Sequence, residues 1–122
     1  MQMPGLLSLA AQSARHAADR HAVTARNMVN ADTPGFLPRD VTPFTPGGDE
    51  MPLRRTRPEH MAGMDGQPWR TFTVAGPVDP NGNGVDLESE ILRGVEANGA
   101  HNRAMTVYKG ALDLMRASVG RG

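Results

Sequence analysis

The distribution of proline is the feature of this sequence that most restricts its fold. Nine of the ten prolines lie between Pro34 and Pro80. A proline inside a helix removes a backbone hydrogen bond and clashes with the preceding turn, so long helices are restricted to the segments before and after this region. The sequence therefore predicts three parts, which are an N-terminal helical segment (1–33), an irregular segment (34–84) and a C-terminal helical segment (85–122).

The C-terminal segment repeats its apolar residues in steps of three and four, which is a heptad pattern. Asp86 is a good N-cap, and Glu88 and Glu90 fall in the first turn, where carboxylates complement the helix dipole. Three interior glycines weaken this helix by about 1 kcal/mol each relative to alanine. The predicted seam holds, in chain order, Leu87, Ile91, Gly94, Asn98, His101, Met105, Tyr108, Leu112, Met115 and Val119.

The N-terminal segment is rich in alanine, which has the highest helix propensity and lets a second helix approach closely. Its apolar residues include Leu6 and Leu9 at the start and Met28 and Val29 at the end. We expect the two helices to pair, antiparallel or more loosely. Two helices of this kind bury only part of their apolar surface, so the pair is either a plain hairpin or completes its burial against other chains.

The middle segment contains one stretch, Trp69–Val74, that alternates β-type residues and predicts one strand of a short hairpin. The rest is too long for an ordinary loop and is either disordered or a surface insert with its own contacts. The predicted fold class is therefore mainly α. Long terminal helices pack like a coiled coil around a Pro/Gly-rich middle that has room for a short β-hairpin.

Composition excludes several classes of function. The 13 basic residues balance the 13 acidic ones, so no basic excess points to nucleic acid. The chain has no cysteine, which excludes disulfides and thiolate metal sites. Its longest apolar runs are too short to span a bilayer. Its N-terminus lacks a basic region followed by an apolar one, so we expect no cleaved secretory signal. The histidines do not form a ligand set or a catalytic motif, so we expect neither an enzyme nor a cofactor. These histidines are His16 and His21 on different helix faces, His60 in the middle and His101 on the seam.

One loop satisfies the sequence expression of an EF-hand calcium site. Its oxygen ligands would be Asp79, Asn81 and Asn83, with Glu90 at the twelfth position. The loop also contains Pro80, no helix is expected to enter it, and no second loop is present to pair with it. A calcium-binding module is therefore an alternative function, and a polar turn that leads into the last helix is the plainer interpretation.

The stretch NMVNADTPGF, which occupies residues 27–36, ends the N-terminal helix. Thr33 precedes proline and is pushed out of the α region, while the Pro-Gly pair fits a type II turn in which glycine takes positive φ. Asn30 can bond the open backbone groups of the helix end through its short side chain. This local explanation does not account for Asn27, which lies one turn earlier.

The same stretch resembles the N-terminal signature of the bacterial flagellar axial proteins, the family of rod, hook and hook-associated subunits. In that signature a helix ends in Asn-x-x-Asn-x-x-Thr-Pro-Gly and an aromatic residue. The matching residues are Asn27, Asn30, Thr33, Pro34, Gly35 and Phe36. Further stretches are similar to the proximal rod members, in the same order and spacing. These are Pro38 to Phe44 around Arg-Asp-Val, Thr56 to Met61, Gly82 to Glu88 (GNGVDLE), Tyr108 to Leu112 and the Gly120-Arg121 end.

The resemblance implies a structural subunit of the proximal rod, located in the periplasm and exported by the flagellar type III apparatus without cleavage of a signal. It implies rod subunits and the rod-to-ring adaptor as partners, with the membrane-ring protein as a further candidate. Another axial protein or an export adaptor is the alternative within the same system. The signature would act as an assembly motif whose asparagines bond neighbouring backbone or subunits. The residues expected at the subunit interface are Leu6, Leu9, Met28, Val29, Leu87, Ile91, Met105, Tyr108, Leu112 and Met115.

Overall fold

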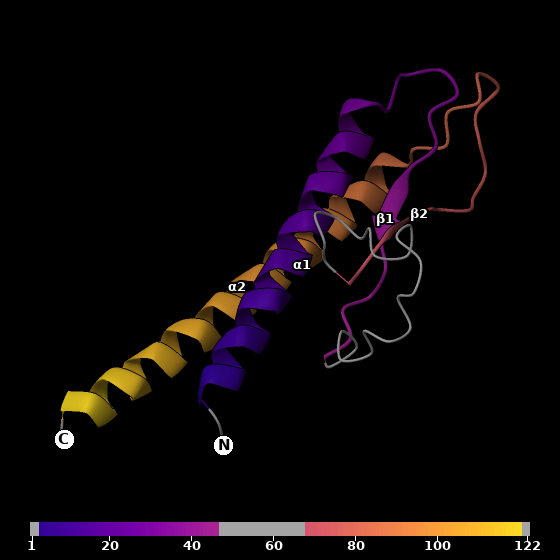
Figure 1. Cartoon of the computed structure of the whole chain (residues 1–122). Coiled ribbons are helices and arrows are strands. Elements are labelled where there is room, and N and C mark those ends of the chain that lie inside the picture. Colours follow the sequence, from indigo (N-terminus) through magenta and orange to yellow (C-terminus); the bar gives the residue numbers. More distant parts are fainter. Residues whose placement is uncertain (1–2, 47–67, 121–122) are drawn as a thin grey trace, which may run out of the picture.

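Two long helices and a small sheet make up the computed structural model, which describes residues 3–46 and 68–120. The elements are, in chain order, α1 (Met3–Val29), β1 (Arg39–Val41), β2 (Thr71–Thr73) and α2 (Leu87–Gly120). The helices run antiparallel, the strands lie on one side of the pair, and both termini lie at one end (Figure 1). We call that end the open end, and the opposite end, where α1 stops and α2 starts, the closed end. The expected mainly α fold, with paired terminal helices, is confirmed.

Helix α1 stops where the sequence predicted a helix end. Arg26 lies in the last turn, where a cation complements the helix dipole. Beyond Val29, the side-chain Nδ2 of Asn30 donates to the Arg26 carbonyl at 2.9 Å, and the Asn30 backbone N–H reaches the same carbonyl at 3.2 Å. These bonds satisfy a carbonyl that the end of the helix would otherwise leave open.

Helix α2 starts at Leu87 because Asp86 caps it. The two carboxylate oxygens of Asp86 accept from the Glu88 N–H at 3.2 Å and from the Ser89 hydroxyl at 2.9 Å. The N-cap prediction is confirmed. The helix continues for 34 residues through its interior glycines, so the glycines lower its stability without ending it.

The two helices meet through small side chains spaced seven residues apart. A seven-residue period keeps one narrow stripe facing the partner helix, and small side chains let the backbones approach closely. The stripe consists of Ala10, Ala17 and Thr24 in α1 and of Glu90, Ala97, Ala104 and Ala111 in α2. The helices are in contact at Gly94, where an added Cβ would meet the Thr24 methyl group at 3.6 Å, an ordinary van der Waals distance.

Only part of the predicted seam of α2 faces α1. Gly94 lies against Thr24 and His101 lines a groove between the helices, but the most buried positions of α2 lie beside the seam. Seam positions 91, 98, 105 and 112 each follow a buried position directly and are therefore turned by about 100° around the helix. Leu87 and Ile91 are 49% and 54% exposed, and Val119 is 79% exposed. The heptad period was correct, but the close contact within the chain selects alanines that flank the seam, because they let the helices approach.

Strands β1 and β2 pair antiparallel, with Asp40 opposite Phe72. The ladder extends by one bond at each end, since the Thr42 N–H donates to the Arg70 carbonyl at 2.7 Å and a second bond joins Val74 to Pro38. The strand predicted within Trp69–Val74 is confirmed as β2. Its partner is a distant segment, so the two strands are not joined by a tight turn.

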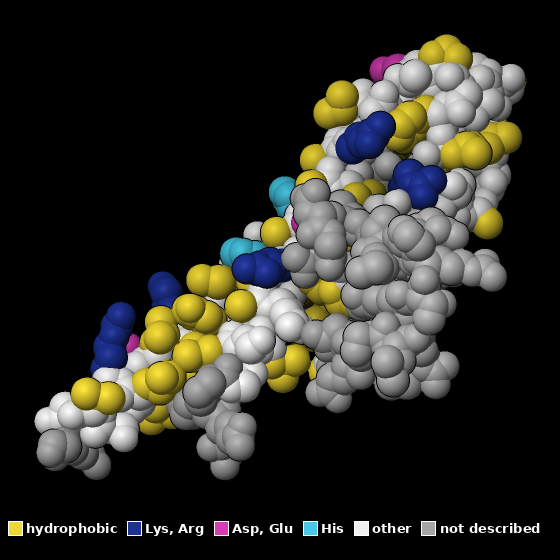
Figure 2. Space-filling model, in the orientation of Figure 1, with side chains coloured by type: hydrophobic (Ala, Val, Ile, Leu, Met, Phe, Trp, Pro, Cys, Tyr) yellow, Lys and Arg dark blue, Asp and Glu magenta, His cyan; other side chains and the backbone are white. Residues whose placement is uncertain are grey.

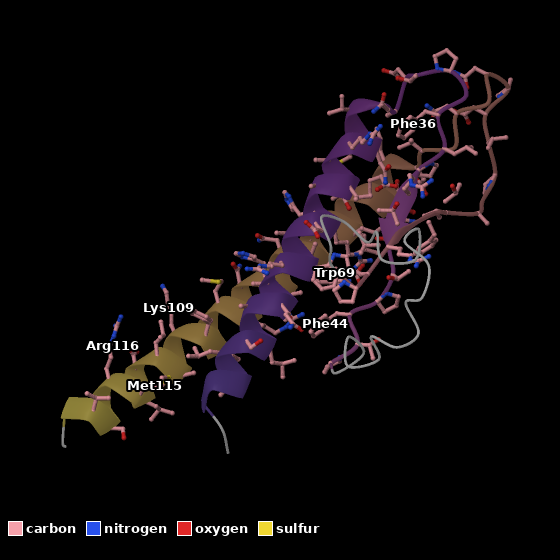
Figure 3. The ribbon with its side chains drawn as sticks, viewed as in Figure 1. Phe36, Phe44, Trp69, Lys109, Met115 and Arg116 are labelled. Atoms are coloured by element: carbon pink, nitrogen blue, oxygen red, sulfur yellow. The ribbon has the colours of Figure 1, made fainter. Side chains whose placement is uncertain are left out.

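An aromatic cluster holds the sheet against α1. Trp69 is 3% exposed, and its indole N–H donates to Asp19 of α1 at 2.8 Å. The ring of His16 lies edge-on to Trp69 at 5.1 Å, and its Nε2 donates to the Thr42 carbonyl at 2.7 Å. Phe44 completes the cluster, 6.1 Å from Trp69 (Figure 3). The single tryptophan therefore fixes the side of the helix pair on which the strands lie.

Candidate functional site

Asn27 lies at the centre of a junction where α1, β1 and α2 meet, and the residue is only 1% exposed. Its Nδ2 donates to the Arg39 carbonyl at 2.7 Å and to Glu90 Oε1 at 2.9 Å, and its Oδ1 accepts from the Arg39 N–H at 3.1 Å. Both amide hydrogens are therefore used. The backbone groups of Pro38 and Thr42, which flank Arg39, bond toward β2. The backbone N–H and carbonyl of Arg39 therefore point away from β2. The side-chain amide of Asn27 bonds to them where a third strand would otherwise lie.

The carboxylate of Glu90 is fully buried beside Asn27 and is neutralised by Arg93, one helical turn further along α2. Arg93 also lies 3.8 Å from the carboxylate of Asp40 in β1, which pairs with Arg20 of α1 at 3.1 Å. Alternating charges thus connect all three elements. Burial of a charge is tolerated only when it is paired and hydrogen-bonded, and each charge here meets that condition.

The turn after α1 is bonded to the loop before α2. The Gly35 N–H donates to the Asn81 carbonyl at 3.0 Å, and the Gly84 N–H donates to the Phe36 carbonyl at 2.9 Å. The two stretches that carry the family resemblance, NMVNADTPGF and GNGVDLE, are therefore the two halves of one contact.

Asn83 fixes the two halves together from the inside. The residue is 2% exposed, and its Nδ2 donates to the carbonyls of Asn30 at 2.9 Å and Thr33 at 2.7 Å. Its Oδ1 accepts from the Val85 N–H at 2.8 Å. All of its polar atoms are satisfied, and within the described residues no buried side-chain nitrogen or oxygen lacks a partner.

Two glycines make the close approach possible. Gly35 has a φ of 75° and Gly82 a φ of 86°, which is a backbone conformation that side chains rarely tolerate. A Cβ on Gly82 would also lie 3.2 Å from the Gly35 Cα. The positive φ predicted for Gly35 is confirmed, whereas the matching requirement at Gly82 was not recognised from the sequence.

The loop that matches the calcium expression uses its polar groups for the junction. The Glu90 carboxylate is buried, the side-chain oxygen of Asn83 accepts from a backbone N–H, and that of Asn81 accepts from the Asn83 N–H at 3.0 Å. Asp79 is exposed. In the part of the chain that the structure describes, no three histidine or acidic residues are grouped to hold a metal. Calcium in this loop would have to replace these bonds.

The remaining signature residues lie at the surface of the turn. The Thr33 hydroxyl donates to the side-chain oxygen of Asn30 at 3.0 Å, Pro34 is exposed, and Phe36 is half-buried (Figure 3). Asn27 and Asn30 thus hydrogen-bond to backbone groups of their own chain, which is one of the two arrangements that the signature predicted. Their contact with other subunits stays a prediction.

The predicted interface residues fall into two groups. Those at the closed end are the more exposed, namely Met28 (38%), Val29 (83%), Leu87 (49%) and Ile91 (54%). Toward the open end, Leu9 is 38% exposed, and the other predicted interface residues are half-buried. These are Leu6, Met105, Tyr108, Leu112 and Met115.

Several residues of the junction were not identified from the sequence. Arg20 and Arg93 were not singled out from the sequence, and Asp40 was noted only as part of the Arg-Asp-Val stretch. His21 and His101 line a small groove between the helices. His60 and the Thr56–Met61 stretch lie outside the described residues.

No family model matches this chain, and a search of curated proteins found no match. Within the described residues, neither helix combines the length and apolar character that a bilayer span requires. A functional assignment therefore depends on the sequence motifs, the junction and the exposed surfaces.

Proposed function

We propose that this chain is a structural subunit of the proximal rod of the bacterial flagellar basal body, assembling through its terminal helices into the drive shaft that transmits torque. The resemblance of the signature and of GNGVDLE to rod subunits is the starting point. The observation that carries the proposal is that α2 exposes a continuous apolar surface which α1 does not cover.

That surface, which we call the α2 patch, lies in the first turns of α2. Its residues follow one another at spacings that put them on adjoining positions of one helix face. They are Leu87 (49% exposed), Ile91 (54%), Leu92 (61%) and Val95 (65%). Exposed apolar patches of this kind mark sites of protein–protein contact, and a subunit that assembles through its helices needs one.

Helix α2 also extends beyond its partner. Thr24 of α1 packs against Gly94 of α2. Helix α1 begins 21 residues before Thr24, at Met3. In an antiparallel pair, Met3 therefore lies level with about position 115 of α2. The last turn of α2 therefore projects past α1 (Figure 1). Hydrophobic side chains gather over the C-terminal half of α2 (Figure 2). In that half, Leu114 is 64% exposed and Val119 is 79% exposed. This second apolar region also suits packing between helices of neighbouring subunits.

The junction suits a structural role. Its polar groups bond to one another and join α1, β1 and α2 into one unit, so the angle at which the chain leaves the helices is fixed. In the proposal, the helices carry the subunit contacts and the sheet side faces outward. The partners are other rod subunits and the rod-to-ring adaptor, with the export apparatus engaged in transit. No cofactor, nucleic acid or small-molecule substrate belongs to it.

The direct test is peptide mass spectrometry of hook–basal bodies purified from the source organism. We expect the chain to be present alongside the other rod subunits. Its clear absence from intact particles would overturn the proposal.

A substitution then tests the surface. Ile91→Glu should be exported but lost from the particles, because a charge in the α2 patch cannot be buried without a partner. Asn102→Glu, at an exposed polar position of the same helix, is the matched control and should be incorporated normally.

A further inference from the structure

We propose that copies of this chain associate head to tail, with the α2 patch of one copy seated in an apolar groove at the open end of the next. This inference rests on the proposed function and names the two surfaces through which identical subunits meet. The occupant of the groove is thus a second copy of the chain.

The open-end groove has a volume of about 320 Å³ and lies where α1, α2 and the segment after β1 converge. Its walls are mainly apolar. The side chains that define it are Leu6 and Leu9 of α1, Phe44 and Pro46 after β1, and Val107 and Arg103 of α2. Large apolar side chains of a partner would fill this space.

Arg103 supplies the charge at the groove. It is the only charged residue among the described residues that line it, it is exposed, and it forms no ion pair within the described part of the chain. A partner that presents a carboxylate beside bulky apolar groups would satisfy both features of the groove.

The α2 patch offers that combination. Glu88 lies three positions before Ile91 and four before Leu92, so its carboxylate borders both side chains on the helix surface. It is exposed and takes part in no ion pair between described residues. The patch and the groove are therefore complementary in both polarity and charge.

The distribution of charge along the molecule also favours head-to-tail association. The closed end exposes carboxylates at Asp32, Asp79, Asp86 and Glu88 against one cation in the last turn of α1, Arg26. The α2 segment toward the open end exposes Arg103, Lys109 and Arg116 against one carboxylate, Asp113, which pairs with Arg116 at 3.9 Å; Lys109 and Arg116 are labelled in Figure 3. Opposite potentials at the two ends attract when copies align head to tail and repel when like ends meet.

The two surfaces lie on opposite faces of the helix pair. Arg93 faces the sheet, where it approaches Asp40, whereas Ile91 and Val95 are each two residues from it and point about 200° away. The groove, by contrast, includes Phe44 on the sheet side. A two-fold axis cannot bring both surfaces together at once, so the contact is heterologous and propagates from copy to copy.

Cysteine cross-linking tests the contact, since the chain has no cysteine of its own. A short bis-maleimide should join Leu9→Cys copies to Ile91→Cys copies when the two are mixed, and neither variant should cross-link alone. In the control, Ala22→Cys replaces Leu9→Cys, because Ala22 is exposed on α1 and lies outside both surfaces. Mixing Ala22→Cys copies with Ile91→Cys copies should give no cross-linked dimer. Cross-links between two Ile91→Cys copies would mean a two-fold contact and would overturn the proposal.

Charge exchange gives a second test by sedimentation velocity. Glu88→Arg and Arg103→Glu should each weaken self-association about tenfold or more, because each brings like charges together. The double variant, and an equal mixture of the two single variants, should restore it. Both positions are exposed, and unchanged circular dichroism would show that the variants fold. The proposal would be overturned if the wild-type protein stays monomeric. It would also be overturned if a soluble maleimide cannot reach the Leu9→Cys thiol, because the chain's own residues would then fill the groove.

These outcomes are separable from the proposed function. If the chain is found in basal bodies but the charge variants associate as the wild type does, the head-to-tail contact is wrong and the rod assignment stands. If head-to-tail association is observed but the chain is absent from basal bodies, the rod assignment fails and the contact stands.

Discussion

Asn27 of α1 donates a 2.9 Å hydrogen bond to Glu90 of α2, and both residues are buried. Glu90 is also the first member of the seven-residue stripe that continues as Ala97, Ala104 and Ala111. The bond and the small alanine side chains therefore favour the same rotation of α2 about its own axis, in which the alanines face α1. The larger apolar residues of α2 are left exposed as a consequence.

Asn27→Asp tests this contact with almost no change of shape. The carboxylate cannot donate to the Arg39 carbonyl or to Glu90, and it places a second negative charge beside a buried one. We expect a loss of about 3 kcal/mol or more in the free energy of unfolding. Urea unfolding followed by circular dichroism measures it. Asn102→Asp, at an exposed position, should stay within about 0.5 kcal/mol of the wild type, and equal behaviour of the two variants would contradict the role given to Asn27.

Calcium should not bind the loop from Asp79 to Glu90. Binding would require Glu90 to leave Arg93 and Asn27, and breaking a buried pair is costly. A calorimetric titration with calcium on the order of millimolar should give no heat beyond dilution. Heat of binding that disappears in Asp79→Asn would instead restore the calcium-binding module as a candidate function.

Two glycines should respond to alanine in opposite directions. Gly110 lies inside α2 with no atom near an added Cβ, so Gly110→Ala should raise stability by about 1 kcal/mol. Gly82 has positive φ, and an added Cβ there would lie 3.2 Å from the Gly35 Cα, so Gly82→Ala should lower stability by about 1 kcal/mol or more. Thermal unfolding of the two variants side by side measures both changes, and a stabilised Gly82→Ala protein would mean that the turn is not held as described.

The helices and the turn could be predicted because their signals are local. Asp86 caps the residues that follow it directly, and the Thr33-Pro34-Gly35 turn needs only its own backbone preferences. The strand at Thr71–Thr73 could be recognised from alternation, but its partner could not. A strand in a short sheet carries no mark of which distant segment completes it.

The junction could not be predicted because its bonds connect residues that are far apart in the chain. Glu90 has two good local explanations, a first-turn acid and a calcium ligand, and neither indicates a fully buried carboxylate. Its true environment depends on Asn27 and Arg93 together. The rotation of α2 was missed for the same reason, since large apolar residues define a seam more clearly in a sequence than alanines do.

The alanine stripe gives the last prediction. Ala111 is 2% exposed where α2 faces α1, and a larger side chain there must push the helices apart or take a strained rotamer. We expect Ala111→Leu to destabilise the protein by about 1–3 kcal/mol, although leucine is the more hydrophobic residue. Leu114→Ala, which removes a larger apolar group at a 64% exposed position, should change stability by no more than about 0.5 kcal/mol. Urea unfolding of both variants measures the contrast. A stabilised Ala111→Leu protein would mean that the helices are not closely packed there and that the seam can turn inward.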